Sequence, residues 1–241
     1  IQSVLSNAVA AQKQWKKQSV AERQALCTKA VDAFVARKYE IGEELSWQMG
    51  RPISQTTGEV GGFEERARYM ISIANTALAD VNPGDKEGFK RYIKREALGV
   101  VFVIAPWNFP YMTAVNAIMP ALLAGNTVIL KHSAQTPLCA ERMHQAFTEA
   151  GLPDGVFQYL HLTHSDTEKV IQSPEINFIA FTGSVPGGEM VERASVGRFV
   201  GAGLELGGKD PAYVRKDADV AFAADNLAEG FLFNAGQSCC A

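Results

Sequence analysis

The stretch GVVFVIAPWNFPYMTAVNAIMPALLAGNTVILK, residues 99–131, decides the fold. It opens with an apolar run rich in β-branched residues at 99–104 and closes with a second such run at 127–130. Between the two runs, residues 111–123 are long enough to form a helix that crosses from one strand to the next. A strand, a crossover helix and a second strand predict two neighbouring parallel strands.

The same alternation continues toward the C-terminus, with short apolar runs separated by longer helical stretches. We expect further strands at 157–160, 178–181 and 204–206, and further helices at 137–150, 165–172 and 186–195. This order predicts an α/β fold, with a Rossmann-like open parallel sheet and helices on both of its faces.

The first 80 residues show the helical spacing of apolar side chains and no strand pattern. Two capping boxes mark expected helix starts, Ser19 with Glu22 and Thr56 with Glu59. The sequence Gly-Arg-Pro at 50–52 divides this region into two helical parts. The N-terminal region is therefore expected to be entirely helical.

Two segments outside the main alternation also carry strand patterns. Polar and apolar residues alternate at 90–94, after turn residues at 82–84, which predicts an edge hairpin at about 84–98. A short strand is expected at 212–214, followed by a helix that starts at Asp217 or Asp219. We expect residues 1–209 to form one domain, and residues 210–241 to begin a second.

Composition limits the classes of partner. With 241 residues, 47% of them hydrophobic, and a net charge of -3, the chain can bury a sizeable core and has no basic stripe for nucleic acid. The longest apolar run, at 97–106, is too short to cross a membrane, and no signal-peptide layout is present, so a cytoplasmic location is expected.

The cysteines and histidines give no metal or disulfide pattern. The four cysteines have no C-x-x-C spacing, which argues against a disulfide framework and a zinc site and predicts reduced thiols. His161 and His164 lack acidic or thiol partners at ligand spacing, so we interpret them as structural or surface residues. No metal is expected.

Polar and glycine residues gather directly after the expected strands, where open parallel sheets bind their ligands. Five motifs carry most of these residues: PWNFP at 106–110, LK-x3-QTP at 130–137, FTGS-x3-G at 181–188, LELGGK at 204–209 and FNAGQSC at 233–239. Together, and in this order, they resemble the aldehyde dehydrogenase superfamily. The resemblance extends over most of the chain from about residue 50 onward.

The resemblance implies three catalytic residues, whose chemistry also suits the task. Cys239 would be the nucleophile, since a thiolate can attack an aldehyde carbon, and its neighbour Cys240 would pack. Asn108, with the backbone N–H of Cys239, would stabilise the resulting oxyanion. Glu205 would be the general base that activates water to cleave the thioester.

Each of these residues also has a structural alternative. Cys239 could be an inert buried thiol, Asn108 could cap the helix that follows it, and Glu205 could form a buried ion pair with Lys209 or Arg198. Lys131 could be a solvated lysine.

The resemblance also implies a nicotinamide dinucleotide, although the sequence has no Gly-x-Gly-x-x-Gly motif. The segment at 183–188 follows a strand and opens a helix, so its N–H groups can face a pyrophosphate. Lys131 would bind the adenosine ribose, with further donors from His132 and Ser133. The expected cofactor-binding residues are Ile104, Ala105, Pro106, Trp107, Lys131, Ser133, Ala134, Gly183, Ser184, Val185, Pro186, Gly187, Gly188, Leu206 and Gly207.

Ala134 stands where the family often has a glutamate that repels a 2'-phosphate, so NADP is slightly favoured over NAD. The resemblance implies oxidation of a small-molecule aldehyde, with a faint similarity to succinate-semialdehyde enzymes, by a homodimer or homotetramer. The alternatives are a non-catalytic dinucleotide-binding or structural protein and a reductive semialdehyde dehydrogenase. Because family members are much longer, we expect the 241 residues alone to bind cofactor weakly and to turn over nothing.

Overall fold

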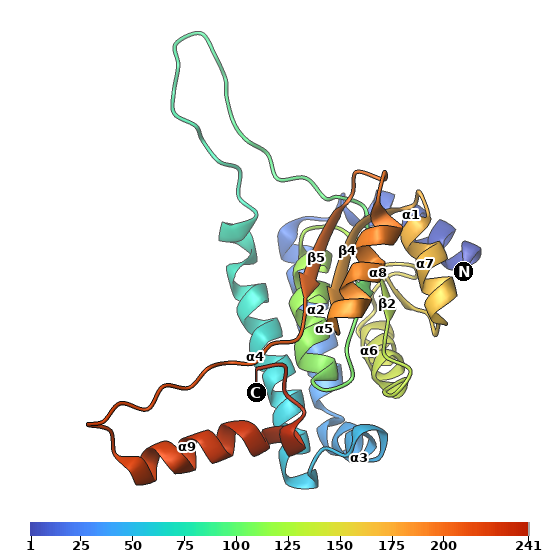
Figure 1. Ribbon diagram of the computed structural model, residues 1–241. Helices are drawn as coiled ribbons and strands as arrows, with labels where there is room; N and C mark the ends of the chain where they lie inside the picture. The colour runs from blue at the N-terminus through green and yellow to red at the C-terminus, as the bar shows by residue number, and fades with distance from the viewer. Residues whose placement is uncertain (241) are drawn as a thin grey trace.

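The computed structural model describes residues 1–240 and contains a five-stranded, fully parallel sheet with the strand order β3-β2-β1-β4-β5. The strands are β1 (Val100–Ile104), β2 (Thr127–Lys131), β3 (Phe157–Tyr159), β4 (Ile176–Thr182) and β5 (Gly201–Glu205). The predicted open parallel sheet is confirmed (Figure 1). The last strand was predicted at 204–206, whereas β5 spans Gly201–Glu205. It therefore lies earlier in the sequence than predicted.

The sequence runs that form β1 and β2 are apolar because these strands are buried. Every residue of β1 and of β2 is buried, because helices cover both faces of the sheet at these strands. In β1, Val101 and Val103 face one apolar cluster, whereas Val100, Phe102 and Ile104 face the other.

Helices flank the sheet on two sides. The cluster on one face includes residues of α2 (Val20–Val35), α3 (Lys38–Met49), α4 (Ile53–Ala77), α5 (Pro110–Leu123) and α6 (Leu138–Glu149). The other face is covered mainly by α1 (Gln2–Trp15), α7 (His164–Gln172) and α8 (Val185–Ser195). The predicted placement of helices on both faces is therefore confirmed (Figure 1).

The N-terminal region is helical, as predicted, but only one of its two expected capping boxes exists. Ser19 and Glu22 form a reciprocal capping box at the start of α2. The box at Thr56 and Glu59 is wrong, because α4 begins earlier, at Ile53, and both residues lie buried within it. The Thr56 hydroxyl donates to the Ile53 carbonyl, and Glu59 has partners outside its own helix.

The two extra strands predicted outside the alternation are not observed. Residues 81–98 form a long excursion beyond α4 with two isolated antiparallel bridges, Val81–Ile93 and Lys86–Phe89, in place of a hairpin with strands (Figure 1). Its side chains are almost all exposed, and a pair of extended segments with no buried face is marginal by itself. Residues 212–214 are likewise irregular and exposed.

The C-terminal helix α9 (Val220–Leu232) forms as expected but stands away from the sheet (Figure 1). The Asp219 side chain accepts a hydrogen bond from the Phe222 N–H and so caps its start. No residue of α9 is buried, although the sequence gives it an apolar face. The division at residue 210 stays a prediction.

Candidate active site

A cleft of about 790 Å³ opens at the carboxyl ends of the strands. The strand register creates it: Ile104 pairs with Lys131 and with Phe181, so the segments after β1, β2 and β4 begin side by side. The Ala105 N–H donates to the Lys131 carbonyl and the Gly183 N–H to the Glu205 carbonyl, which extends this alignment beyond the strands.

Most of the predicted site residues line this cleft. They are Ile104, Ala105, Pro106, Trp107, Asn108, Lys131, Ser133, Gly183, Ser184, Pro186, Gly187, Leu206, Gly207 and Cys239. Four predicted residues do not line it: Ala134, Val185, Gly188 and Glu205. Gly188 is instead buried at a close approach, since a Cβ there would lie 2.7 Å from a methyl group of Leu206.

Lys131 ends β2 and is 8% exposed. Within residues 1–240 it has no ion-pair partner, and burial lowers the pKa of its ammonium group. A buried ammonium group without a counter-charge suits a ligand that offers hydroxyl or anionic oxygens. The alternative of a solvated lysine is therefore wrong.

The turn from β4 into α8 supplies the other polar wall. Ser184 is the N-cap residue, and its hydroxyl accepts a hydrogen bond from the Gly187 N–H. The turn is closely packed, since a Cβ at Gly183 or at Gly187 would lie within 2.7 Å of the Phe181 ring. The N-terminal end of α8 thus borders the cleft, where its N–H groups and dipole favour an anion.

His132 does not serve as a donor to the cleft, contrary to our expectation. Its ring is 2% exposed, and its Nδ1 accepts the Ser133 N–H, which leaves the proton on Nε2 to donate to the Pro110 carbonyl at 3.2 Å. Burial lowers its pKa to about 4, so the ring is neutral. His132 therefore joins the end of β2 to the start of α5.

Asn108 lies in the turn between β1 and α5, and it does not cap the helix. The N-cap residue is Phe109, which makes no capping hydrogen bond through its side chain. The N–H groups of Tyr111 and Met112 donate instead to Glu59 of α4, each at 3.0 Å. With the helix capped from outside, the Asn108 side chain accepts only the adjacent Phe109 N–H, among the described residues, and its Nδ2 donates elsewhere.

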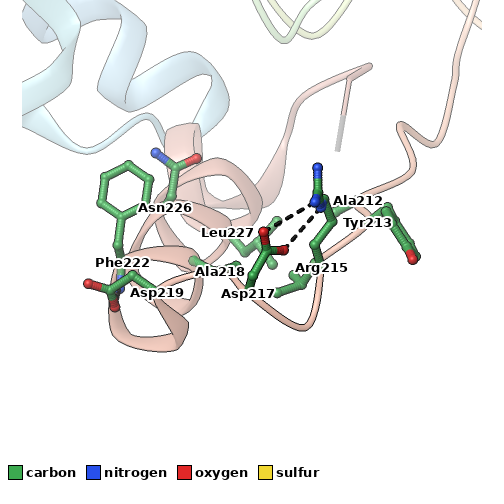
Figure 2. A pocket seen from close by; sticks show the side chains of 11 residues that line it. Ala212, Tyr213, Arg215, Asp217, Ala218, Asp219, Phe222, Asn226 and Leu227 are labelled. Carbon is green, nitrogen blue, oxygen red and sulfur yellow. Dashed lines mark hydrogen bonds and ion pairs between the residues drawn. The ribbon is translucent and has the colours of Figure 1, made fainter.

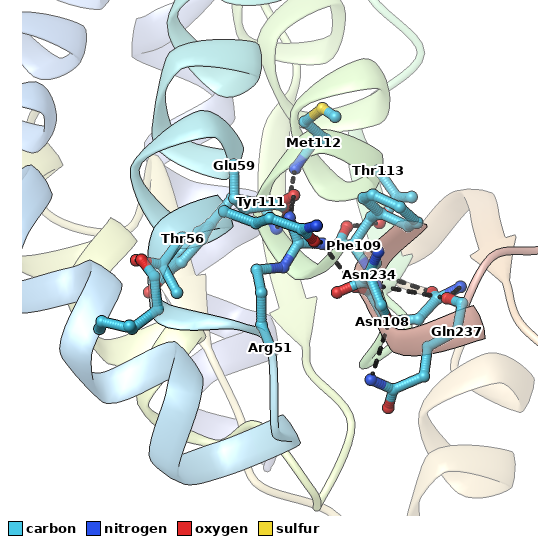
Figure 3. A network of polar contacts seen from close by, with 12 residues as sticks. Arg51, Thr56, Glu59, Asn108, Phe109, Tyr111, Met112, Thr113, Asn234 and Gln237 are labelled. Atoms are coloured by element: carbon cyan, nitrogen blue, oxygen red, sulfur yellow. Dashed lines mark hydrogen bonds and ion pairs between the residues drawn. The ribbon is translucent and has the colours of Figure 1, made fainter. Parts of the chain in front are cut away.

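That amide group is tied to the segment that bears the predicted nucleophile. Asn108 Nδ2 donates to the Gln237 carbonyl at 2.9 Å, and Asn234 Nδ2 donates to the Asn108 carbonyl at the same distance (Figure 3). Cys239 follows two residues after Gln237 and lines the same cleft as Asn108. The structure thus brings two of the three predicted catalytic side chains together.

The four cysteines fall into two kinds. Cys27 and Cys139 are buried; burial raises the pKa of Cys27 to about 12 and that of Cys139 further still. Cys239 and Cys240 are exposed, with their sulfur atoms 3.6 Å apart. The hydrogen bond and charge of Cys239 raise the pKa of Cys240. Cys239 is therefore no inert buried thiol, and the expectation that Cys240 packs is wrong.

Glu205 is the predicted residue that the structure leaves apart. It ends β5 with an exposed side chain that does not line the cleft. The alternative of a buried ion pair is also wrong, because Arg198 donates to the carbonyls of Ile171 and Ile176, and Lys209 makes no ion pair with Glu205. Within residues 1–240 the Glu205 side chain makes no hydrogen bond or ion pair, whereas its carbonyl accepts the Gly183 N–H.

The model of the aldehyde dehydrogenase family matches residues 1–241. The chain belongs to the aldehyde dehydrogenase family. It is 33% identical to a 3,6-anhydro-alpha-L-galactose dehydrogenase from Streptomyces coelicolor, over 99% of this chain and 49% of that protein. It is 34% identical to an NADP(+) succinate-semialdehyde dehydrogenase from Mycobacterium avium, over 92% of this chain and 47% of that protein.

Solved structures of aldehyde dehydrogenases agree with this assignment. A succinic semialdehyde dehydrogenase from Streptococcus pyogenes, solved in complex with NADP+, superposes with a TM-score of 0.92 at 27% identity, over 98% of this chain and 52% of that one. The chain thus spans about half the length of the relatives it matches. The predicted fold and family are confirmed.

Sequence reasoning missed several residues that line the cleft or contact the segments around it. Arg51, Gln55 and Glu59 contact the segments that carry Asn108 and Cys239, yet they precede the first strand. The signal available was the spacing of four residues, which places Gln55 and Glu59 on one face of a helix. Thr113, His164, Thr167, Met190 and Gly236 also line the cleft and were not predicted to do so.

A second hollow, of about 470 Å³, lies between α9 and the segment 212–219 (Figure 2). Its prominent charged group is already paired, because Arg215 donates two hydrogen bonds to Asp217. None of the predicted site residues lies there. Over residues 1–240 the structure has neither a group of residues suited to hold a metal ion nor a helix able to cross a membrane.

Proposed function

We propose that this protein oxidises an aldehyde to a carboxylic acid, with NADP or NAD as the hydride acceptor. The observation that carries the proposal is the hydrogen bond from Asn108 Nδ2 to the Gln237 carbonyl, which joins an amide donor to the segment that bears an exposed thiol. A nucleophile beside an oxyanion donor, in one cleft, is the arrangement that acyl chemistry requires.

In the proposed reaction, the thiolate of Cys239 attacks the carbonyl carbon and the carbonyl oxygen becomes an alkoxide. The Asn108 amide group has two N–H bonds, of which one is directed to Gln237, so the other can donate to the alkoxide. Loss of hydride converts the thiohemiacetal on Cys239 to a thioester. Water then cleaves the thioester, releasing the acid and restoring the thiol.

The residues of the cleft fit a dinucleotide. Lys131 would supply a buried positive charge for the adenosine ribose or its phosphate, and the N–H groups at the N-terminus of α8 would hold the pyrophosphate. The bound cofactor would supply the hydride acceptor. Ala134 brings no carboxylate to the ribose side, so we propose that NADP is accepted at least as well as NAD.

Glu205 is the proposed general base for cleavage of the thioester. To act, its exposed carboxylate has to turn from the end of β5 toward the cleft. Its position outside the cleft is also the observation that favours a second candidate, a reductive semialdehyde dehydrogenase, because that reaction needs no hydrolytic base. A non-catalytic dinucleotide-binding protein is less well supported, since Cys239 and Asn108 are both present and share the cleft.

The experiment that tests the proposal is an assay of the protein at its natural length with an aldehyde panel that includes succinate semialdehyde. We expect formation of NADPH or NADH together with the carboxylic acid. Cys239→Ser should abolish both products, and Cys240→Ser is the matched control. If the natural-length protein forms no reduced cofactor, or if Cys239→Ser keeps its activity, the proposed oxidation is wrong.

The assay also separates the second candidate. Cofactor oxidation by an acyl donor, without hydrolysis, would favour the reductive reaction. The homodimer or homotetramer predicted from the sequence is a proposal of its own, and sedimentation of the same sample tests it.

A further inference from the structure

Three polar side chains at and just before the start of α4 contact the segments that carry Asn108 and Cys239. They are Arg51, Gln55 and Glu59, spaced four residues apart, and we name them the α4 polar stripe. Arg51 lies just before α4, and the other two lie in its first two turns. None of the three lines the cleft, so none can touch a ligand bound there.

The two charged members form a buried ion pair. Arg51 Nη1 lies 3.2 Å from Glu59 Oε2, and the side chains are 1% and 0% exposed. Burial raises the pKa of Glu59, whereas Arg51 and the two N–H groups of α5 act to lower it. A buried pair of this kind rarely adds stability over an apolar pair, so the pair invites another explanation.

Arg51 has a second task, which fixes the backbone of Asn108. Its Nη2 donates to the Asn108 carbonyl at 3.0 Å, and its guanidinium group lies 4.7 Å from the centre of the Phe109 ring (Figure 3). Glu59 meanwhile accepts the N–H groups of Tyr111 and Met112. The turn that carries Asn108 is thus held on both sides by the pair.

Gln55 holds the other segment. Its Oε1 accepts the Asn234 N–H at 3.0 Å. Asn234 and Ala235 are non-glycine residues in the left-handed region, with φ of 54° and 56°, a conformation that costs roughly 1–2 kcal/mol per residue and needs support. Because Asn234 also donates to the Asn108 carbonyl, the stripe and both segments form one hydrogen-bonded network.

We propose that the α4 polar stripe is a positioning device that sets the Asn108 amide group relative to Cys239. This inference rests on the proposed function, because positioning matters only if the two residues react with one substrate. An oxyanion donor acts over a narrow range of distances, and a misplacement of about 1 Å can cost on the order of 100-fold in rate. The stripe residues act through Asn108 and Cys239 and are not catalytic residues themselves.

The first test is Arg51→Lys in the protein at its natural length. Lysine keeps the charge beside Glu59 but lacks the planar fork that reaches both Glu59 and the Asn108 carbonyl. We expect kcat to fall about tenfold while the KM for cofactor changes less than twofold. Arg142→Lys is the matched control, because Arg142 pairs with Glu44 between α6 and α3, away from the cleft.

A double-mutant cycle separates positioning from general support of the fold. If Arg51 acts through Asn108, then Arg51→Lys should lower kcat less than twofold in a background of Asn108→Ala. An equal tenfold loss in both backgrounds would show that Arg51 acts independently of Asn108 and would overturn the proposal. So would an unchanged kcat in the single variant.

An activity-independent measurement keeps this inference distinct from the proposed function. Hydrogen exchange of Gln55→Ala should become at least about tenfold faster in residues 233–239, with little change in the strands, because the Asn234 N–H loses its acceptor. Wild-type protein that forms no product would refute the proposed oxidation, whereas unchanged exchange in Gln55→Ala would refute the role of the stripe.

Discussion

The two walls of the cleft are built on different principles. The wall that carries Asn108 is backed by buried polar contacts: Glu59 caps α5, Arg51 holds the Asn108 carbonyl, and His132 binds the Pro110 carbonyl. The wall that carries Cys239 has an exposed thiol, and the Cys239 carbonyl accepts the Gly208 N–H. The Asn108 turn is thus held in place by buried partners, whereas the Cys239 thiol is left accessible.

The largest predicted effect is the loss of kcat when the Asn108 amide group is removed. Asn108→Ala should lower kcat by about 100- to 1,000-fold, because one preorganised donor to the oxyanion is lost. Steady-state kinetics at the natural length of the protein measure it. Asn116→Ala is the control, because Asn116 is an exposed asparagine of α5 whose amide oxygen accepts only from Arg66. A loss of less than about threefold in Asn108→Ala would show that the backed wall takes no part in the chemistry.

A second effect concerns the buried imidazole of the same wall. The pKa of His132 in the folded protein is lowered to about 4 from its ordinary 6.5, so the unfolded chain binds the extra proton first as the pH falls. The contribution of neutral His132 is therefore complete above pH 6.5 and is lost progressively down to about pH 4.

Urea unfolding at several pH values measures this loss. We expect the free energy of unfolding to fall by as much as about 1.4 kcal/mol per pH unit across that window from this one group. In His132→Gln the slope should be smaller by about that amount. An unchanged slope would mean that the ring is charged or exposed in the folded protein.

A third, smaller effect tests the lysine at the floor of the cleft. Lys131→Met should raise the KM for cofactor about tenfold or more, because a hydrogen bond from a charged group is lost, while kcat changes little. Fluorescence titration with NADP and NAD gives the same comparison at equilibrium. Equal cofactor affinity in Lys131→Met and in the wild type would show that the cofactor binds away from Lys131.

The smallest predicted effect on kcat is that of replacing Cys240. Cys240→Ser should change kcat less than about threefold, because the neighbouring sulfur is exposed and takes no part in the proposed reaction. Mass spectrometry after iodoacetamide should show Cys239 labelled in the variant and in the wild type, with Cys27 and Cys139 unlabelled. If Cys240→Ser lost more activity than Cys239→Ser, Cys240 and not Cys239 would be the nucleophile.

Much of the fold was accessible from the sequence because its strands are buried on both sides. Continuous apolar runs such as 100–104 and 127–131 can be satisfied only inside a sheet covered by helices, and the turn residues after them mark the ligand edge. The alternation of polar and apolar residues at 90–94 led to a wrong strand prediction. A two-residue period indicates which way side chains point, but it does not show that the segment has a surface to pack against.

The site was predicted in part for a similar reason. Motifs adjacent to strand ends pointed to Asn108 and Lys131, and the motif after the last helix pointed to Cys239; all three line the cleft. Glu59 was read as a capping residue of its own helix, because the N–H groups that donate to its carboxylate come from a segment 52 or more residues away. The exposed state of Glu205 depends on what lies over β5, which local sequence does not encode.

The position of β1 at the centre of the sheet has a consequence for the order of assembly during synthesis. The ribosome makes β1 before either of its neighbours, so its hydrogen bonds to β2 must wait for residue 131 and those to β4 for residue 182. At about 5–20 residues per second, the remaining residues up to Cys239 take several seconds more. The strands that border the cleft can therefore pair before the Cys239 thiol has left the ribosome.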